Sequence, residues 1–152
     1  MKTKVNEISI KYHGNSRISQ APIITSSFSA NELLFENWNK DQIGLQECFK
    51  VMLLNNANKV KGIYEVSSGG ITRTMVDLRI LFAVLLKSLT TAVILAHNHP
   101  SGTLRPSEAD KTLTEKIKNA AGFFDIKLLD HLIITPDGEF FSFADELSLI
   151  HI

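Results

Sequence analysis

Two histidines and an aspartate are the residues of this sequence whose types and spacing best suit metal chemistry. His97 and His99 stand at the end of the apolar run 92–96, and Asp110 follows after a short loop. Side chains two residues apart in a strand point to the same side, so we expect the two imidazoles to converge. Imidazole and carboxylate are ligands of Zn²⁺, and three protein ligands with a fourth position left for water are typical of catalytic zinc. The pattern therefore predicts a catalytic zinc site.

Ser107 and Asp110 also fit the beginning of a helix. The pattern Ser107-x-x-Asp110 is a variant of the capping box, with Ser107 as the N-cap and Asp110 as the third helical residue. A carboxylate near a helix N-terminus is favoured by about 0.3–1 kcal/mol. The Ser107 hydroxyl is able to cap the helix or face the site. For Asp110 the capping and metal-binding interpretations compete, and we favour the metal.

The hydrophobic pattern predicts the elements that position these residues. The predicted order is strand, strand, helix, strand, helix, strand, strand, over 47–55, 60–70, 78–90 with Asp77 as cap, 91–97, 107–121, 126–135 and 139–143, followed by a last half-turn over 144–150. This order predicts an α+β domain of three α/β/α layers, in which a mixed β-sheet is flanked by helices.

The first 44 residues have a pattern of their own, separate from the strand and helix order of the rest of the chain. Residues 5–12 alternate apolar and polar side chains, which predicts a short strand, and residues 29–32 (SANE) carry a capping-box signature at the beginning of a helix. We therefore predict two parts, a short N-terminal extension over 1–44 (strand plus helix) and a single domain over 45–152.

Composition narrows the classes of partner. Lys plus Arg equals Asp plus Glu at 16 each, so the formal net charge is zero. Binding to nucleic acid normally needs a basic surface, so direct contact with DNA or RNA has no support from charge. Lys111, Lys116 and Lys118 form a local basic cluster, but such lysines are more often the solvated face of a helix.

The cysteine content and the N-terminus exclude two further classes. The single cysteine, Cys48, leaves no internal disulfide and no cysteine-based zinc cluster, and we expect it to be a small core residue. The N-terminus has no apolar leader segment, and no apolar run approaches the length of a membrane span. We expect a cytoplasmic protein with no membrane partner.

The two histidines, the serine and the aspartate together resemble a known motif. His97-x-His99 followed by Ser107-x-x-Asp110 is similar to the pattern of the JAB/MPN (JAMM) metallopeptidases, whose fold is cytidine-deaminase-like. Three longer segments resemble the RadC branch of that family: LAHNHPSG (95–102), PSEAD (106–110) and LLDHLIIT (128–135). The similarity extends from about Glu47 to about Glu146.

The resemblance implies a cofactor, a substrate and two catalytic residues. It implies Zn²⁺ held by the two histidines and Asp110, with a peptide or protein substrate bound in an extended conformation. A glutamate on an upstream strand acts as the base in such enzymes, and Glu47 is the position that corresponds to it, with Glu65 as the rival. The resemblance also implies that Ser107 donates to the developing oxyanion.

Three functions are compatible with these residues. The first is a zinc-dependent hydrolase of peptide or isopeptide bonds. The second, from the label of the RadC branch, is a factor in DNA repair or nucleic-acid processing. The third is a metal-free interaction module of the same fold, which we rank last because the ligands are all present. A zinc deaminase is disfavoured because the P-C-x-x-C segment of that site is missing.

Three further polar residues lie next to the motif or inside an apolar strand. Strand geometry turns Asn98 away from the two histidines, so we expect it to shape the loop. Asp130 and His131 interrupt the apolar run 128–135. One of them could orient a ligand imidazole from behind, although a satisfied histidine of the core is the commoner interpretation.

Overall fold

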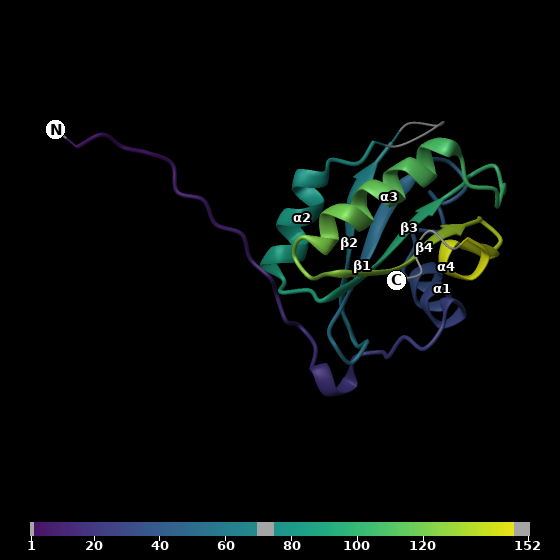
Figure 1. Ribbon diagram of the computed structural model, residues 1–152, viewed down its shortest axis with the longest axis horizontal. Helices are drawn as coiled ribbons and strands as arrows, with labels where there is room; N and C mark the ends of the chain where they lie inside the picture. Colours follow the sequence, from purple (N-terminus) through teal and green to yellow (C-terminus); the bar gives the residue numbers. More distant parts are fainter. Residues whose placement is uncertain (1, 70–74, 148–152) are drawn as a thin grey trace.

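A mixed β-sheet forms the centre of the protein. The computed structural model describes residues 2–69 and 75–147 (Figure 1). The elements are η1 (Ile18–Gln20), α1 (Ser27–Glu36), β1 (Cys48–Leu54), β2 (Val60–Ser68), α2 (Leu78–Lys87), β3 (Ala92–Asn98), α3 (Glu108–Gly122), β4 (Lys127–Ile134), β5 (Phe140–Ser142) and α4 (Phe143–Glu146).

The strands lie in the order β2-β1-β3-β4-β5. β1 pairs antiparallel with both β2 and β3, β3 pairs parallel with β4, and β4 pairs antiparallel with β5. A parallel pair needs a crossover connection, and α3 supplies it between β3 and β4. The expected mixed sheet with helices packed on it is therefore confirmed.

Alternation along the strands divides the core into two layers. On one face Phe49, Val51 and Leu95 pack against α2 and α3, in a cluster that includes Leu81 and Ile117. This alternation of side chains has the period of two that a pleated strand imposes. Figure 1 shows α2 and α3 lying together across the sheet.

The opposite face is covered by α1 and the chain that follows it. Met52 of β1 and Ile94 of β3 pack there with Leu34, Trp38 and Ile43. Burial of each such side chain contributes roughly 1.5–3 kcal/mol relative to exposure to water. The sheet thus has helices on both faces, which confirms the three-layer α+β architecture.

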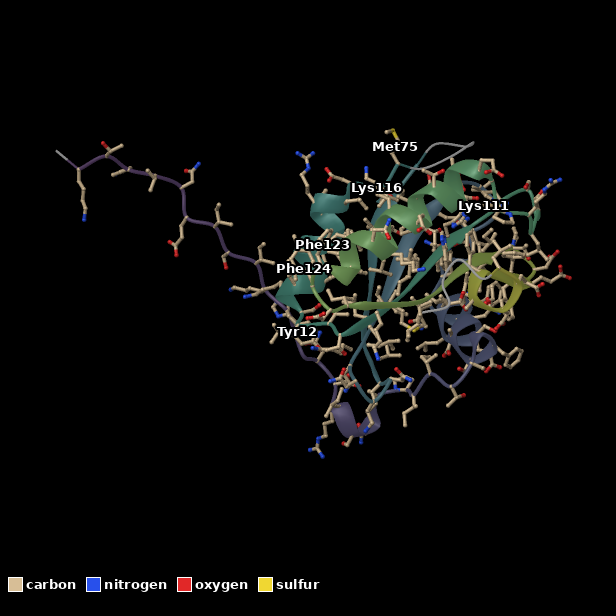
Figure 2. All side chains as sticks on the ribbon, viewed as in Figure 1. Tyr12, Met75, Lys111, Lys116, Phe123 and Phe124 are labelled. Carbon is tan, nitrogen blue, oxygen red and sulfur yellow. The ribbon has the colours of Figure 1, made fainter. Side chains whose placement is uncertain are left out.

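The expected strand over residues 5–12 is wrong. The structure has no regular secondary structure there, and the segment runs away from the sheet (Figures 1 and 2). Val5 and Ile8 are 86% and 87% exposed, so alternation alone gave the expected pattern without a neighbouring strand to pair with. Near the end of the segment, the hydroxyl of Tyr12 donates a hydrogen bond to the Lys61 carbonyl at 3.2 Å.

Several element boundaries also differ from expectation. The first helix begins earlier, because Ser26 is its N-cap and Ser29 is the third helical residue of the capping box. Helix α2 ends at Lys87, and Leu89 has a φ of 52°, which helical backbone does not adopt. Gly70 and residues 148–150 lie outside the described residues. The division of the chain at residue 44 stays a prediction.

Candidate metal centre

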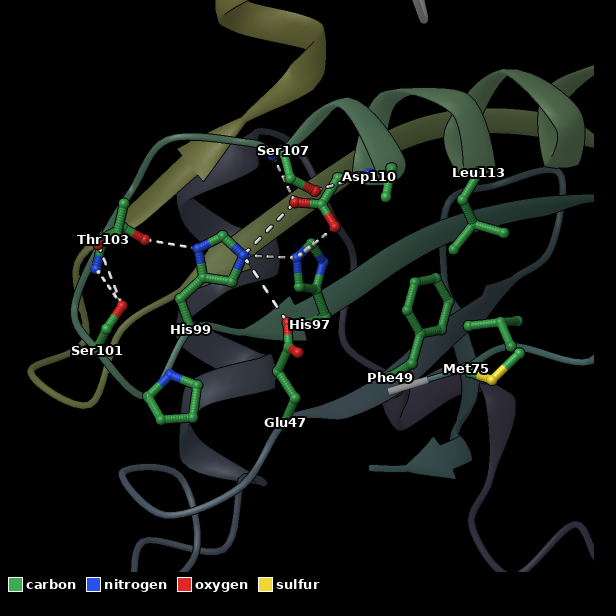
Figure 3. A pocket seen from close by; sticks show the side chains of 13 residues that line it. Glu47, Phe49, Met75, His97, His99, Ser101, Thr103, Ser107, Asp110 and Leu113 are labelled. Carbon is green, nitrogen blue, oxygen red and sulfur yellow. Dashed lines mark hydrogen bonds and ion pairs between the residues drawn. The ribbon is translucent and has the colours of Figure 1, made fainter. Parts of the chain in front are cut away.

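Three segments bring the predicted ligands together at one end of the sheet. His97 lies near the end of β3, His99 follows it, and Asp110 is in the first turn of α3 (Figure 3). The Nε2 atoms of His97 and His99 are 3.0 Å apart. Asp110 places Oδ1 at 3.4 Å from Nε2 of His97 and Oδ2 at 3.6 Å from Nε2 of His99. The structure therefore brings the two imidazoles and the carboxylate to one point.

These separations match those between the ligands of one zinc ion. Ligands about 2.0–2.1 Å from zinc at tetrahedral angles lie roughly 3.3–3.4 Å from one another. The ligand atoms of Glu47, His97 and His99 also lie within 4.8 Å of one another, so they form a possible metal-binding group. A divalent cation that accepts nitrogen and oxygen ligands fits the chemistry of this set.

Asp110 caps its helix and faces the histidines with the same carboxylate. Its Oδ2 accepts a hydrogen bond from the Ser107 N–H at 2.8 Å, and Ser107 Oγ accepts one from the Asp110 N–H at 3.0 Å. This reciprocal pair is a complete capping box. The capping interaction and the approach to the histidines coexist, so the expected competition between them for Asp110 is absent from this geometry.

The pKa values of Asp110 and His99 are both shifted in the direction that favours a positive charge between them. Burial raises the pKa of Asp110, but the imidazoles of His97 and His99 beside its carboxylate outweigh burial and hold the pKa well below its usual range. Burial lowers the pKa of His99, yet the nearby Asp110 carboxylate and the Thr103 carbonyl outweigh burial and leave the pKa raised. A proton or a metal cation at this point is therefore stabilised by the surrounding side chains.

Glu47 reaches the same site from the segment before β1, the strand that pairs with β3. It directly precedes β1, and its Oε1 lies 3.9 Å from Nε2 of His99. The side chain of Asn98 binds the backbone on both sides of Glu47. Its Oδ1 accepts from the Cys48 N–H at 2.7 Å, and its Nδ2 donates to the Gln46 carbonyl at 2.9 Å. Asn98 thus points away from the histidines, as expected, and holds the segment that carries Glu47.

The other candidate glutamates lie elsewhere. Glu65, the rival for the role of base, forms an ion pair with Lys50 at 3.9 Å, and half of its side chain is exposed. The Glu108 side chain is 92% exposed and lies 3.5 Å from Lys111. Among the glutamates considered, Glu47 is the one that shares a pocket with the two histidines.

The pocket around this site has a polar and an apolar part. Its volume is about 760 Å³. The carboxylates, the imidazoles and Ser107 form the polar part. Phe49, Met75, Val76 and Leu113 line the other side, as Figure 3 shows for those it labels. An apolar group beside the polar centre is therefore compatible with the shape of the pocket.

Asp130 and His131 have different roles. Asp130 accepts hydrogen bonds from the His131 N–H, the Ala144 N–H and the Ser142 hydroxyl, so it joins β4 to the beginning of α4. The ring of His131 is fully buried, and burial together with neighbouring His97 lowers its pKa well below the usual value. Nε2 of His131 lies 2.7 Å from Nδ1 of His97, so this histidine contacts a predicted ligand directly.

Two threonines complete the contacts of the histidines, and we did not expect either from the sequence. Nδ1 of His99 donates to the Thr103 carbonyl at 2.7 Å, which leaves the lone pair of a neutral ring on Nε2. Oγ1 of Thr114 lies 2.6 Å from Nδ1 of His131. The first contact uses a backbone atom, and the second depends on how α3 packs on β4, so local patterns carried no signal for either.

Comparisons with known proteins identify the family of this chain. The model of the RadC-like JAB domain family matches residues 24–148. The chain belongs to this family. A UPF0758 protein of Flavobacterium johnsoniae is 52% identical over 100 residues, which cover 66% of this chain and 43% of that protein. The UPF0758 protein YeeS of Escherichia coli is 41% identical over 122 residues, or 80% of this chain and 79% of that protein.

Two UPF0758 relatives extend well beyond the matched region. A UPF0758 protein of Porphyromonas gingivalis is 48% identical over 101 residues, which are 66% of this chain and 44% of its own length. The chain thus spans less than half the length of the Flavobacterium and Porphyromonas relatives. Within the described parts of this RadC-like chain, no helix has the length and apolar character to cross a membrane.

Proposed function

We propose that this RadC-like JAB domain is a zinc-dependent hydrolase that cleaves peptide or isopeptide bonds. The observation that carries the proposal is the convergence of His97, His99 and Asp110, with nitrogen and oxygen atoms 3.0–3.6 Å apart. Two imidazoles and one carboxylate suit zinc, and they leave a coordination position for a water or a substrate oxygen. When bound, zinc polarises the scissile carbonyl and lowers the pKa of an attacking water.

Glu47 is placed to move the proton that hydrolysis requires. Hydrolysis of an amide takes a proton from the attacking water and gives one to the leaving nitrogen, and one carboxylate can do both. Oε1 of Glu47 lies 3.9 Å from Nε2 of His99, so the carboxylate would lie beside a water held at this metal site. The hydrogen bonds between the Asn98 side chain and the backbone of Gln46 and Cys48, which we call the Asn98 clamp, hold the backbone around Glu47 in place. We therefore assign the role of general base to Glu47.

Ser107 is placed to stabilise the oxyanion. Its Oγ accepts the hydrogen bond from the Asp110 N–H through a lone pair, so that interaction does not consume the hydroxyl proton. Ser107 also lines the pocket beside the two histidines. A donor in such a position typically contributes about 10²–10³ in rate.

The substrate is a peptide or protein bound in an extended conformation. An apolar substrate side chain fits against Leu113, Val76 and Met75, while its backbone crosses the polar part of the pocket. Met75 is 80% exposed and contributes an accessible apolar contact at the mouth of the pocket. A role in nucleic-acid processing, the other function that the RadC label suggests, has no comparable support in the site.

The test separates metal binding from proton transfer. We expect Glu47→Gln to keep about one zinc per chain and to lose hydrolysis of a peptide library by at least about 10²-fold, because the base is removed while the ligands stay. His97→Ala and Asp110→Ala should lose zinc. Metal content is measured by atomic absorption, and hydrolysis by mass spectrometry of the products.

The matched control is Glu65→Gln, which removes a glutamate of the neighbouring strand away from the histidines. It should leave both zinc content and hydrolysis unchanged. Unchanged turnover in Glu47→Gln would show that Glu47 is not the general base. Zinc retained in both His97→Ala and Asp110→Ala would show that the proposed ligands are wrong.

A further inference from the structure

A buried row of polar side chains continues from His97 into the protein. Nδ1 of His97 lies 2.7 Å from Nε2 of His131, and Nδ1 of His131 lies 2.6 Å from Oγ1 of Thr114. The row ends where Thr114 Oγ1 donates to the Asp110 carbonyl at 2.7 Å. His131 and Thr114 are both 0% exposed. β3, β4 and α3 each contribute to this row, which joins one predicted ligand to the backbone of another.

The hydrogen bonds of this row have a fixed direction. A threonine hydroxyl has one proton, and here it goes to the Asp110 carbonyl. Thr114 Oγ1 must therefore accept from Nδ1–H of His131. A neutral imidazole has one N–H, so Nε2 of His131 carries a lone pair and accepts from Nδ1–H of His97. By the same rule, the lone pair of neutral His97 lies on Nε2.

That direction matters because of where Nε2 of His97 lies. It is 3.0 Å from Nε2 of His99 and 3.4 Å from Asp110 Oδ1. The opposite tautomer would place a proton on Nε2 and no lone pair at this point, so it could not bind a metal there. In the observed row the backbone carbonyl at the far end determines which nitrogen of His97 is available.

Aromatic packing keeps the middle of the row in its orientation. The ring of His131 stacks on Phe143 with centroids 4.5 Å apart, and its edge meets Phe49 at 5.6 Å. Phe49 also stacks on His97 at 6.1 Å. A flip of the His131 ring, which would exchange its two nitrogens, would have to displace these neighbours.

We propose that Thr114 and His131 are positioning residues that hold His97 in its Nδ1–H tautomer, with the Nε2 lone pair directed at the metal site. Neither residue touches the substrate pocket. The effect on zinc affinity rests on the proposed function, whereas the tautomer of His97 is a property of the metal-free protein and does not. Partners of this kind typically contribute about 10–100-fold to metal affinity.

The experiment compares two substitutions of Thr114. Thr114→Val removes the hydroxyl with almost no change in volume, and Thr114→Ser keeps it. Long-range ¹H–¹⁵N spectra of the histidine rings, recorded on metal-free protein at pH 7.5 (roughly one unit above the ordinary histidine pKa), report the tautomer of His97. Zinc affinity is measured on the same samples by competition with a chromogenic chelator.

In the wild type and in Thr114→Ser we expect Nδ1 of His97 to be protonated. In Thr114→Val we expect a mixture of tautomers and zinc affinity lower by about 10–100-fold. His131→Phe, which keeps the ring that stacks on Phe143, should show the same two effects. It carries the test if Thr114→Val does not fold.

A different result would overturn the proposal. If Thr114→Val or His131→Phe lowers the midpoint of urea unfolding but leaves the Nδ1–H tautomer of His97 and the zinc affinity unchanged, the row contributes only to stability. If the wild type has the Nδ1–H tautomer but binds no zinc, the proposed function fails. The spectra of Thr114→Val then still decide whether the row sets the tautomer.

Discussion

The side chain of Ser107 belongs both to helix α3 and to the pocket. Its oxygen accepts the N–H of Asp110, and Asp110 in turn accepts the N–H of Ser107. The same two residues therefore begin the helix and line the candidate metal centre. A simple loss of activity after substitution would not tell these roles apart.

A pair of substitutions at Ser107 separates them. Ser107→Ala should lower the free energy of unfolding by about 1 kcal/mol, since the N-cap acceptor is lost, and should lower turnover by about 10²–10³. Ser107→Asp is the matched control, because its carboxylate caps the helix but has no hydroxyl proton to donate. We expect stability to recover in Ser107→Asp and turnover to stay low. The measurements are urea unfolding in a chelator and peptide hydrolysis with zinc. Recovery of turnover in Ser107→Asp would contradict the donor role.

Sequence patterns predicted some contacts of single residues and could not predict others. The convergence of His97 and His99 follows from strand alternation, which acts over two residues. The contact between His131 and His97 depends on the register in which β3 and β4 pair, where His97 lies opposite Ile133. No local pattern contains that register, so the sequence left the role of His131 open.

Strand β3 is the element that joins the two halves of the site. Its residues alternate between the layers, so His97 faces α3 and Asn98 faces the segment before β1. The Asn98 side chain is fully buried and binds three backbone groups, of Ile43, Gln46 and Cys48. The alternation of β3 thus places a predicted ligand and the support of the predicted base on adjacent residues.

Substitution of Asn98 should therefore affect stability as well as turnover. Asn98→Asp removes both amide donors and leaves the carbonyls of Ile43 and Gln46 without them, at a cost of about 1–3 kcal/mol for each buried group. We expect a lower midpoint of urea unfolding and, with zinc bound, reduced peptide hydrolysis because Glu47 is less well held. The control is Asn56→Asp in the exposed turn between β1 and β2, which should change neither. Unchanged stability in Asn98→Asp would show that the clamp contributes little.

Elements were predicted well wherever a strand has neighbours on both sides. β1 and β3 are central in the sheet, and their long apolar runs were identified correctly. Residues 5–12 also carry a pattern typical of a strand, but a strand needs a partner for its backbone groups, and that requirement is not visible in a local window. The beginning of α1 was misplaced because several serines near residue 26 satisfy the same capping rule.

The charges of the whole molecule are balanced. Lysines plus arginines and acidic residues number 16 each. Lys111 and Lys116 lie on the outer surface of α3 (Figure 2), but Lys111 is paired with Glu108 at 3.5 Å. A shallow groove beside these lysines also includes Glu115, so the surface there has mixed charge. The mixed charge of this groove gives no support to the interpretation of these lysines as a nucleic-acid surface.

We therefore expect no measurable affinity for DNA at physiological salt. Fluorescence anisotropy of labelled duplex and single-stranded oligonucleotides, with up to about 10 μM protein, should remain flat at both about 50 mM and about 200 mM salt. The zinc-loaded wild type and Asp110→Ala are compared, so that any effect of the metal is visible. Binding that weakens steeply with salt would instead favour the nucleic-acid function over hydrolysis.

The alternation of β3 also has a consequence for how the site assembles. A slip of one residue in the pairing of β3 would turn both imidazoles into the layer of Trp38 and bring the amide of Asn98 into the pocket. An ion at the proposed site would therefore bind only after β3 has paired in the correct register, and we expect metal uptake to follow sheet formation during refolding. Metal binding would then stabilise the molecules in which β3 has the correct register, and would not stabilise those in which it has slipped.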